Sequence, residues 1–425
     1  MSLDITPIQP QRVAVIGGGI SGLAAAYLLC PHHAVTLFEA ETRLGGHART
    51  VQAGLRGDQP VDTGFIVFNY ANYPHLTRMF KDLEVPVVRS DMSFGASIDN
   101  GRIEYGLRDL VALTTQKRNL LRPGFARMVR DILRFNKHAE AFAQDDETTI
   151  GQLMDQLGLG RWFQQYYLTP LCGAIWSTSP NQIRAFPARS LVQFFRNHAL
   201  LSTSGQHQWW TVDGGSIEYV RRLEHHLKGR GAALHAGTPV ERVLRSQNEV
   251  TVVTRHGPQT FDQVIFACHS DQALRMIDAP TRQEQDVLSA MRFQDNRMIL
   301  HRDTAQMPRR RGVWSSWVYK TDTTRPEPAI GVTYWMNKLQ NIPESDPLFV
   351  SLNPSEPVRD ELIYDEKTFR HPVFDSAALA AQTKLKQMQG QNRSWFAGAY
   401  TRHGFHEDGF ASAVRLTRMM ESQTV

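Results

Sequence analysis

The sequence predicts an α/β fold: a Rossmann-like nucleotide-binding domain with an inserted α+β domain. Three observations support this prediction. A β-branched run at residues 12–16 ends in a glycine-rich turn, a strongly helix-forming stretch follows that turn, and the middle of the chain mixes helical and strand-like periodicity. A chain of 425 residues is also too long for one small core, so we expect two domains.

The first strand and turn carry a G-x-G-x-x-G spacing. The run RVAVI suits a buried parallel strand, and GGGISG follows it before the helix-forming LAAAYLLC. Gly17 permits the tight turn, Gly19 lets the backbone approach a pyrophosphate, and Gly22 lets the helix pack on the strand. The helix N-terminus offers amides to the anion. The expected contact residues are Gly17, Gly19, Ile20, Ser21 and Gly22.

The second strand supplies an acidic residue. AVTLF ends at Glu39, twenty residues after Gly19, and a carboxylate there can accept hydrogen bonds from both ribose hydroxyls of an adenosine. Ala40 follows as a further expected contact. Strand, helix, strand and acid in register favour a dinucleotide site over an unliganded glycine turn. This element alone does not separate NAD from FAD.

The continuation AETRLGGHART places Gly45, Gly46 and His47 in an E-x-x-x-x-x-G-G-[RH] segment. With it the sequence resembles the flavin-containing amine oxidoreductase superfamily, which includes monoamine oxidases, protoporphyrinogen oxidases and phytoene desaturases. The resemblance implies FAD. Two glycines allow a turn that brings amides against the diphosphate, flanked by Arg43 and Arg49. A glycine turn beside two solvated arginines is the alternative.

Further segments extend the resemblance in the family's order. VDTGFIVFN brings Thr63 and Gly64 to the place where family backbone lies near the flavin. WWTVDGGSIEYV resembles a P-x-G-G segment, Val240 falls where the family contacts adenine, and FDQVIFACHS resembles a closing strand that includes Ala267. The resemblance therefore spans the whole chain.

The C-terminal stretch FAGAYTRHGFHEDGFASA carries the last part of the resemblance, through Gly398, Gly409 and Ala411. It departs from the family at Ala399 and Tyr400, where an acidic residue is usual. Either Glu407 or Asp408 makes that contact, or backbone alone does. The motif holds no cysteine, so we expect FAD to be bound non-covalently.

These scattered segments imply a discontinuous FAD-binding domain. We expect it to comprise residues 1–75, 205–275 and 390–425, with a substrate domain formed by residues 76–204 and 276–389. The first insertion looks mainly helical, and the second suits a mixed sheet.

A flavin accepts hydride at N5, so no dedicated nucleophile is required. Three side chains are candidates for a catalytic role: Lys338 as the holder of a water, Phe410 as an aromatic cage residue over the flavin, and His47. A surface lysine, a packing phenylalanine and a structural histidine are the competing interpretations. The histidines show no ligand spacing, so we expect no metal.

The motifs look most like bacterial predicted NAD/FAD-binding proteins whose relatives occur beside cyclopropane-fatty-acid-synthase-like methyltransferases. That likeness implies dehydrogenation of an unsaturated or methyl-branched acyl chain of a lipid. An amine oxidase, a double-bond isomerase and a non-catalytic flavoprotein partner are the alternatives. The sequence leaves open the electron acceptor and the oligomeric state.

Composition and charge bear on location and partners. The net charge is +5 and favours anionic neighbours. We expect no nucleic acid, and peripheral membrane contact is one interpretation of the basic amphipathic segment Lys117–Lys137, with packing on its own domain as the other. The three cysteines are widely spaced, and neither a signal sequence nor a long apolar run is evident. We therefore expect a cytoplasmic protein, at most touching the inner face of the cytoplasmic membrane.

Overall fold

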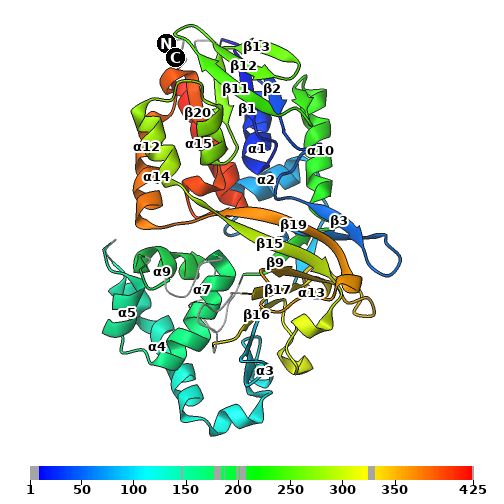
Figure 1. Cartoon of the computed structure of the whole chain (residues 1–425), viewed down its shortest axis with the longest axis vertical. Coiled ribbons are helices and arrows are strands. Elements are labelled where there is room, and N and C mark those ends of the chain that lie inside the picture. The colour runs from blue at the N-terminus through cyan, green and yellow to red at the C-terminus, as the bar shows by residue number, and fades with distance from the viewer. Residues whose placement is uncertain are drawn as a thin grey trace, which may run out of the picture.

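A computed structural model of the chain has two parts stacked along its long axis (Figure 1). It describes residues 9–144, 147–176, 183–185, 187–197, 201, 207–323 and 331–423. The upper part in Figure 1 is built around a parallel sheet, and the lower part combines a mixed sheet with a group of helices. The long strands β15 (Phe293–His301) and β19 (Ile363–Pro372) run between the two parts.

The upper part contains a five-stranded, all-parallel sheet in the order β10-β2-β1-β14-β20. Its strands are β1 (Arg12–Ile16), β2 (Ala34–Phe38), β10 (Ala233–His235), β14 (Gln263–Phe266) and β20 (Ser394–Phe396). Val13 and Val15 pack into one hydrophobic cluster, whereas Ala14 and Ile16 pack into another on the opposite face. Because both faces are covered, the central strand β1 is apolar at every position from Val13 to Ile16.

Helices and a small sheet cover the two faces. One face carries α1 (Ile20–Leu29), α2 (Pro74–Asp82), α10 (Ile217–Gly229) and α15 (His406–Gln423). The other carries α11 (Ser270–Met276), α12 (Arg282–Ala290), α14 (Ser376–Met388) and the antiparallel strands β11 (Val240–Arg245), β12 (Val250–Thr254) and β13 (Gly257–Phe261). The dinucleotide-binding fold predicted from the first forty residues is confirmed.

The lower part contains a seven-stranded mixed sheet in the order β19-β15-β18-β17-β16-β7-β8. Its further strands are β7 (Phe94–Ile98), β8 (Ile103–Gly106), β16 (Trp317–Thr321), β17 (Gly331–Trp335) and β18 (Phe349–Leu352). The short helix α13 (Met336–Leu339) follows β17 directly. The helices are α3 (Leu110–Thr114), the 3-10 turn η1 (Lys117–Leu121), α4 (Pro123–Phe142), α5 (Ile150–Gln156), α6 (Arg161–Phe163), α7 (Thr169–Trp176) and α9 (Ala188–Asn197).

Two short sheets lie where the parts meet. They are the hairpin β3 (Thr50–Ala53) with β4 (Gln59–Asp62), and the set β5 (Val67–Phe68), β9 (Trp209–Val212) and β6 (Val87–Ser90). The buried carboxylate of Asp62 accepts hydrogen bonds from the Ser216 amide, the Thr50 hydroxyl and the Gln340 amide group. Asp62 thereby ties the hairpin to both parts.

Four segments depart from the predicted substrate domain, which comprised a helical insertion at residues 76–204 and a second insertion at residues 276–389. Helices α2, α12 and α14 pack in the upper part, and residues 94–98 and 103–106 form strands. Helix α2 packs Leu76, Met79 and Phe80 into the cluster beneath α1, because these three apolar residues share one face. Strands β7 and β8 join the seven-stranded sheet, where β7 pairs in parallel with β16. The three helices were assigned to the wrong domain because a helical pattern does not specify which core its apolar face packs against. Strands β7 and β8 lie in the predicted domain but not as helices, because their patterns are only five and four residues long.

The basic segment around Lys117–Lys137 forms η1 and most of α4. Phe125 and Met128 are buried in the helical core, and Val129 and Ile132 face a cavity between the two parts. The apolar stripe of α4 therefore packs within the protein, except for Leu133, which is 55% exposed.

Candidate active site

A cavity of about 1680 Å³ runs between the two parts of the protein. One end is walled by the glycine turn after β1 and by the ends of β2 and β14, and the other by α3, α4 and the seven-stranded sheet. The volume exceeds the few hundred to ~1,000 Å³ of a typical single-ligand pocket. The cavity has room for a cofactor and a second ligand together.

The two glycine turns lie against each other at the upper end. The Gly45 amide donates to the Gly18 carbonyl over 2.8 Å, and Gly45 and Gly46 have left-handed φ values of 110° and 57°. A Cβ on Gly46 would lie 3.0 Å from Gly19 Cα. Because neither turn has side chains at this contact, backbone amides line the cavity directly.

Glu39 is fixed at the end of β2. Its Oε2 accepts from the Gly18 amide over 2.6 Å, and its Oε1 accepts from the Glu41 amide over 2.7 Å. The carboxylate lines the cavity together with Ala40 and Val240. This is the place where the sequence predicts adenosine recognition.

Most predicted contact residues line the cavity, although contact with a cofactor remains a prediction for each. The lining set comprises Gly17, Gly19, Ile20, Ser21, Glu39, Ala40, Gly46, His47, Thr63, Gly64, Val240, Ala267 and Gly398. Gly22, Gly45, Gly409 and Ala411 lie behind this wall. A Cβ on Gly22 would be 1.8 Å from the Gly17 carbonyl oxygen, and one on Gly409 would be 2.8 Å from Ser21 Oγ. These two glycines let α1 pack on the first turn and α15 pack on α1.

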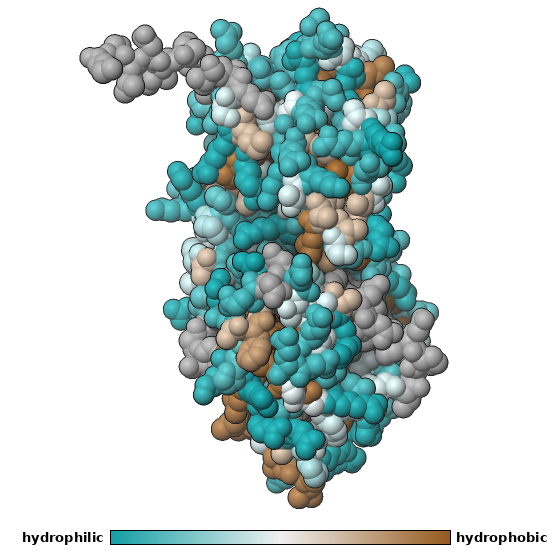
Figure 2. All heavy atoms as spheres, turned by 90° about the vertical axis from the view of Figure 1, so that its left-hand side faces the viewer, coloured by the Kyte–Doolittle hydropathy of each residue, from teal (hydrophilic) through white to brown (hydrophobic). Residues whose placement is uncertain are grey.

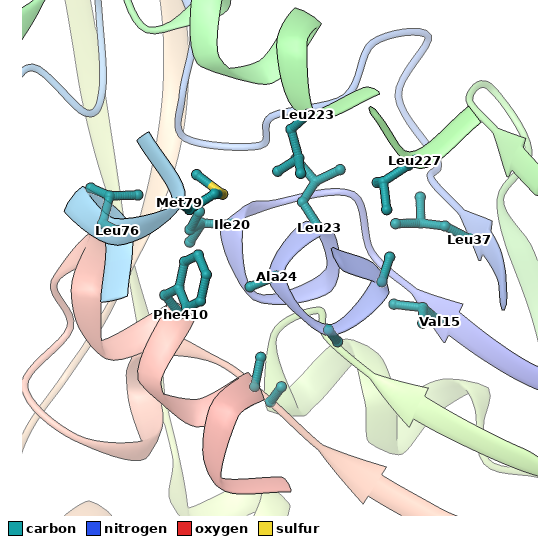
Figure 3. Packing of buried hydrophobic residues seen from close by; sticks show 14 of the residues in the cluster. Val15, Ile20, Leu23, Ala24, Leu37, Leu76, Met79, Leu223, Leu227 and Phe410 are labelled. Carbon is teal, nitrogen blue, oxygen red and sulfur yellow. The ribbon is translucent and has the colours of Figure 1, made fainter. Parts of the chain in front are cut away.

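Phe410 does not reach the cavity. Its side chain is 2% exposed and lies in the core with Ile20, Leu76 and Met79, as Figure 3 shows, and its ring stacks on His75. The cage role expected for it was wrong, because helix α15 turns this residue toward α2. The competing interpretation as a packing residue holds.

Lys338 also lies outside the cavity lining. Its ammonium group pairs with Glu344 over 2.7 Å and lies 5.3 Å from the centre of the Trp335 ring. A lysine on α13 with 43% of its side chain exposed cannot hold a water inside the cavity, so the catalytic role expected for it was wrong.

Glu407 and Asp408 are both engaged by backbone amides away from the cavity. Glu407 accepts from the amides of His75 and Leu76, and Asp408 accepts from those of His403 and Phe405. Neither acid takes the place of the family's missing carboxylate. The remaining alternative, contact by backbone alone, agrees with Gly398 and Ala399 lining the cavity.

Replacing Glu407 with glutamine should reduce the change of the free energy of unfolding with pH between pH 4.5 and about 7. Burial raises the pKa of Glu407 to about 7, against the opposing effect of its two amide hydrogen bonds. Between its ordinary pKa of 4.5 and about 7, the folded protein holds a proton that the unfolded chain has lost, so stability falls as the pH rises. We expect the wild type to lose on the order of 2 kcal/mol more than E407Q across this window in thermal unfolding. Parallel profiles of the two proteins would show that folded Glu407 is ionised.

Four histidines gather at the middle of the cavity, and only His47 was a predicted site residue. His47 lies 4.9 Å from Phe369, 5.6 Å from His371 and 6.2 Å from His269, measured between ring centres. His406 stacks on Phe65 at 3.9 Å. These residues come from five separate segments, so spacing along the sequence gave no signal for the group.

Burial keeps these imidazoles neutral. Burial lowers the pKa of His47 to about 4, and the neighbouring His269 lowers it further. Burial also lowers the pKa of His269 to about 4, and there the neighbouring Arg370 adds to the effect. Burial lowers the pKa of His371 and of His406 to about 3. At neutral pH the four rings therefore act as neutral hydrogen-bonding groups and carry no positive charge.

The described residues fit the dinucleotide that the sequence predicts. The glycine turns present backbone amides, and Glu39 presents a fixed carboxylate. Five buried polar atoms on the cavity wall have no described hydrogen-bond partner: His47 Nε2, Asn136 Oδ1, His269 Nδ1, Trp317 Nε1 and the Tyr400 hydroxyl. Buried polar groups are normally satisfied, so a polar ligand suits these positions.

The lower end of the cavity is mainly apolar, with Asn136 and the exposed Arg108 and Asp109 as its polar lining residues. Its wall includes Leu107, Leu113, Val129, Ile132, Leu133 and Leu171. Such a surface binds hydrocarbon and excludes water. In the part of the chain that the structure describes, no group of three or more His, Cys, Asp or Glu side chains could hold a metal ion.

A family model and the sequences of known proteins both match this chain. The family model described as flavin containing amine oxidoreductase matches residues 20–295. Human protoporphyrinogen oxidase is 27% identical over 325 residues, which cover 66% of this chain and 64% of the human protein. The chain thus matches somewhat less than two thirds of that relative's length.

Solved structures share the fold over nearly the whole chain. The CLA-producing fatty acid isomerase from P. acnes superposes with a TM-score of 0.69 at 15% identity, covering 98% of this chain and 99% of the isomerase. Cyclohexylamine oxidase from Brevibacterium oxydans gives a TM-score of 0.69 at 14% identity, with the same coverage of both chains. At these identities the likeness shows the fold alone.

Proposed function

The chain belongs to the flavin-containing amine oxidoreductase family, and from this premise we propose that it dehydrogenates the acyl chain of a lipid. It is an FAD-dependent oxidoreductase with a Rossmann-like fold. The proposed substrate is an unsaturated or methyl-branched fatty acyl chain, which loses two hydrogens to become further desaturated.

One observation carries the proposal: the cavity continues from the nucleotide end into an apolar compartment. Val129, Ile132 and Leu133 on α4 and Leu107 near α3 wall this compartment, and they offer surface for methylene groups. Each buried methylene contributes ~0.8 kcal/mol to binding. A short amine would leave most of this surface uncovered.

The residues of the upper end would hold FAD. The turns at Gly19 and Gly46 would receive the diphosphate, Glu39 the adenosine ribose, and Val240 the adenine, and bound FAD supplies hydride acceptance at N5. A thioether to the flavin would need a cysteine beside the flavin ring. The cysteine that lines the cavity, Cys268, lies instead at the nucleotide end, where its amide nitrogen is 3.1 Å from the position of a Cβ on Gly17. We therefore propose that FAD is held without a covalent bond.

The chain's own side chains position the substrate and control its surroundings. The apolar wall orients the acyl chain and excludes water, which protects a redox step from side reactions. His47, neutral at physiological pH and with its Nε2 free of described partners, is the candidate to hold a proton near the reacting carbon. The fatty acid isomerase with the same fold supports the proposal only to this extent: a protein of this fold acts on a fatty acid.

The test is anaerobic mixing of the purified flavoprotein with free fatty acids, phospholipids and a panel of amines while the flavin absorbance is followed. We expect bleaching by an acyl substrate and not by amines, together with a product two mass units lighter.

Each other outcome rejects the dehydrogenase. Bleaching by an amine would establish an amine oxidase. A shifted double bond with no net bleaching would establish an isomerase, and an unreactive flavin with every lipid would leave a binding role.

A further inference from the structure

Large hydrophobic side chains are exposed at one end of the molecule. Of the nine such side chains among the described residues, seven lie between residues 107 and 142. The most exposed of these seven are Leu110 at 77%, Val111 at 73%, Leu120 at 58% and Leu121 at 85%. Figure 2 shows hydrophobic side chains gathered at the lower end, where Figure 1 places α3. Single exposed leucines are common, but a cluster marks an interaction surface.

Local structure holds these leucines outward. In η1 the side chain of Asn119 is buried and donates to the Glu104 carbonyl over 3.0 Å, while Leu120 and Leu121 face solvent. The buried Gln116 accepts from the Glu104 amide over 2.7 Å. This segment therefore inverts the usual pattern, with polar residues inside and apolar residues outside.

The same end is basic. Between Leu110 and Arg122 there are three basic residues and no acidic residue. Beside η1, a hollow of about 490 Å³ is lined by Arg102, Arg118, Arg309 and Arg310, with Asp99 as its one carboxylate. Asp99 pairs with Arg102, and Arg310 pairs with the buried Glu104. No described carboxylate forms an ion pair with Arg118.

We propose that the tip formed by α3 and η1 docks on an anionic lipid bilayer. Leu110, Val111, Leu120 and Leu121 insert among the acyl chains, and Arg118 with its neighbouring arginines binds headgroup phosphates. An apolar tip flanked by arginines matches the boundary between hydrocarbon and anionic headgroups. A second copy of the protein would bring like charges together, so the lipid surface is the favoured partner.

The cavity reaches the surface at this tip. Leu107, Arg108 and Leu110 line the cavity and are also exposed, and Leu133 on α4 is 55% exposed on the same wall. A docked protein would receive an acyl chain directly from the bilayer into the apolar compartment. This last step rests on the proposed function, whereas docking itself does not.

The experiment is flotation of the purified holoprotein with vesicles. One vesicle set contains phosphatidylcholine and phosphatidylglycerol in equal parts, and the other contains phosphatidylcholine alone. We expect binding to the anionic vesicles, at least about tenfold weaker for the L120S/L121S variant and for R118E. Raising the salt to about 1 M, where the Debye length is ~3 Å, should weaken the contribution of Arg118.

Matched controls lie on the loop between β3 and β4. Leu55 is 64% exposed and the Arg56 side chain is 85% exposed, so L55S and R56E remove comparable groups elsewhere. These controls should float like the wild type, and all variants should keep the wild-type flavin spectrum and Tm.

Three outcomes would overturn docking: no binding by the wild type, equal loss in the control variants, or a change of oligomeric state in L120S/L121S without a change in vesicle binding. Turnover of a detergent-dispersed fatty acid, measured separately, tests the proposed function. A protein that turns over this substrate but does not bind vesicles would contradict the docking proposal alone. A protein that binds vesicles but does not turn over the substrate would contradict the proposed function alone.

Discussion

Replacing Gly19 with valine is expected to yield a folded protein that has lost most of its FAD. Gly19 has an extended backbone, with φ of −76° and ψ of −176°, which valine adopts without strain. A Cβ there meets only Gly46 Cα, at 4.0 Å. The added methyl groups would occupy the space where the diphosphate approaches the backbone. We expect FAD affinity to fall at least about 100-fold, which is about 2.8 kcal/mol.

The measurement is flavin content per protein after gel filtration, with Tm recorded for the FAD-free proteins. G229V is the matched control, because a Cβ on the exposed Gly229 meets nothing within 4 Å and Gly229 does not line the cavity. Full flavin retention by G19V would place the diphosphate elsewhere. A collapse of the Tm of FAD-free G19V would instead give the glycine a role in folding.

Replacing Ile132 with aspartate is expected to abolish lipid turnover while FAD stays bound. Ile132 is half-buried on the face of α4 that lines the apolar compartment. A carboxylate there either remains unpaired in an apolar wall or takes up a proton, and both cost several kcal/mol when an acyl chain covers it. We expect kcat/KM for the lipid substrate to fall at least about 100-fold.

Ala126→Asp is the control, since it adds the same carboxylate to the exposed face of α4. It should retain kcat/KM close to the wild-type value. If I132D turned over the lipid normally with full flavin content, the acyl chain would have to bind outside this compartment.

The cofactor end was predictable because its signals are local. The G-x-G-x-x-G spacing and Glu39 follow from one strand, one turn and the next strand, and the structure brings them to the same end of the cavity. Gly22 has the packing contact that the motif predicts, whereas Gly409, expected as a cofactor contact, packs α15 on α1. A motif identifies where a glycine is required without saying which neighbour requires it.

The centre of the cavity was not predictable in the same way. His269, His371 and His406 meet His47 only because β14, β19 and α15 converge there. Phe410 follows a motif closely, yet its direction depends on the rotation of α15 against α2, which no local pattern specifies. Lys338 failed for a similar reason, because its partner Glu344 lies on the following loop at the surface.

The parallel sheet takes its strands from distant stretches of the chain, and this has a consequence for biosynthesis. Strand β14 ends at Phe266, and its neighbour β20 begins at Ser394. At ~5–20 residues per second, the ribosome needs roughly 6 to 26 seconds to make the intervening chain. During that interval the edge of β14 is unpaired, and α1 lacks its packing partner α15. An open strand edge beside apolar surface invites aggregation, so nascent chains should depend on chaperones, and FAD can be captured only after β20 and α15 have been made.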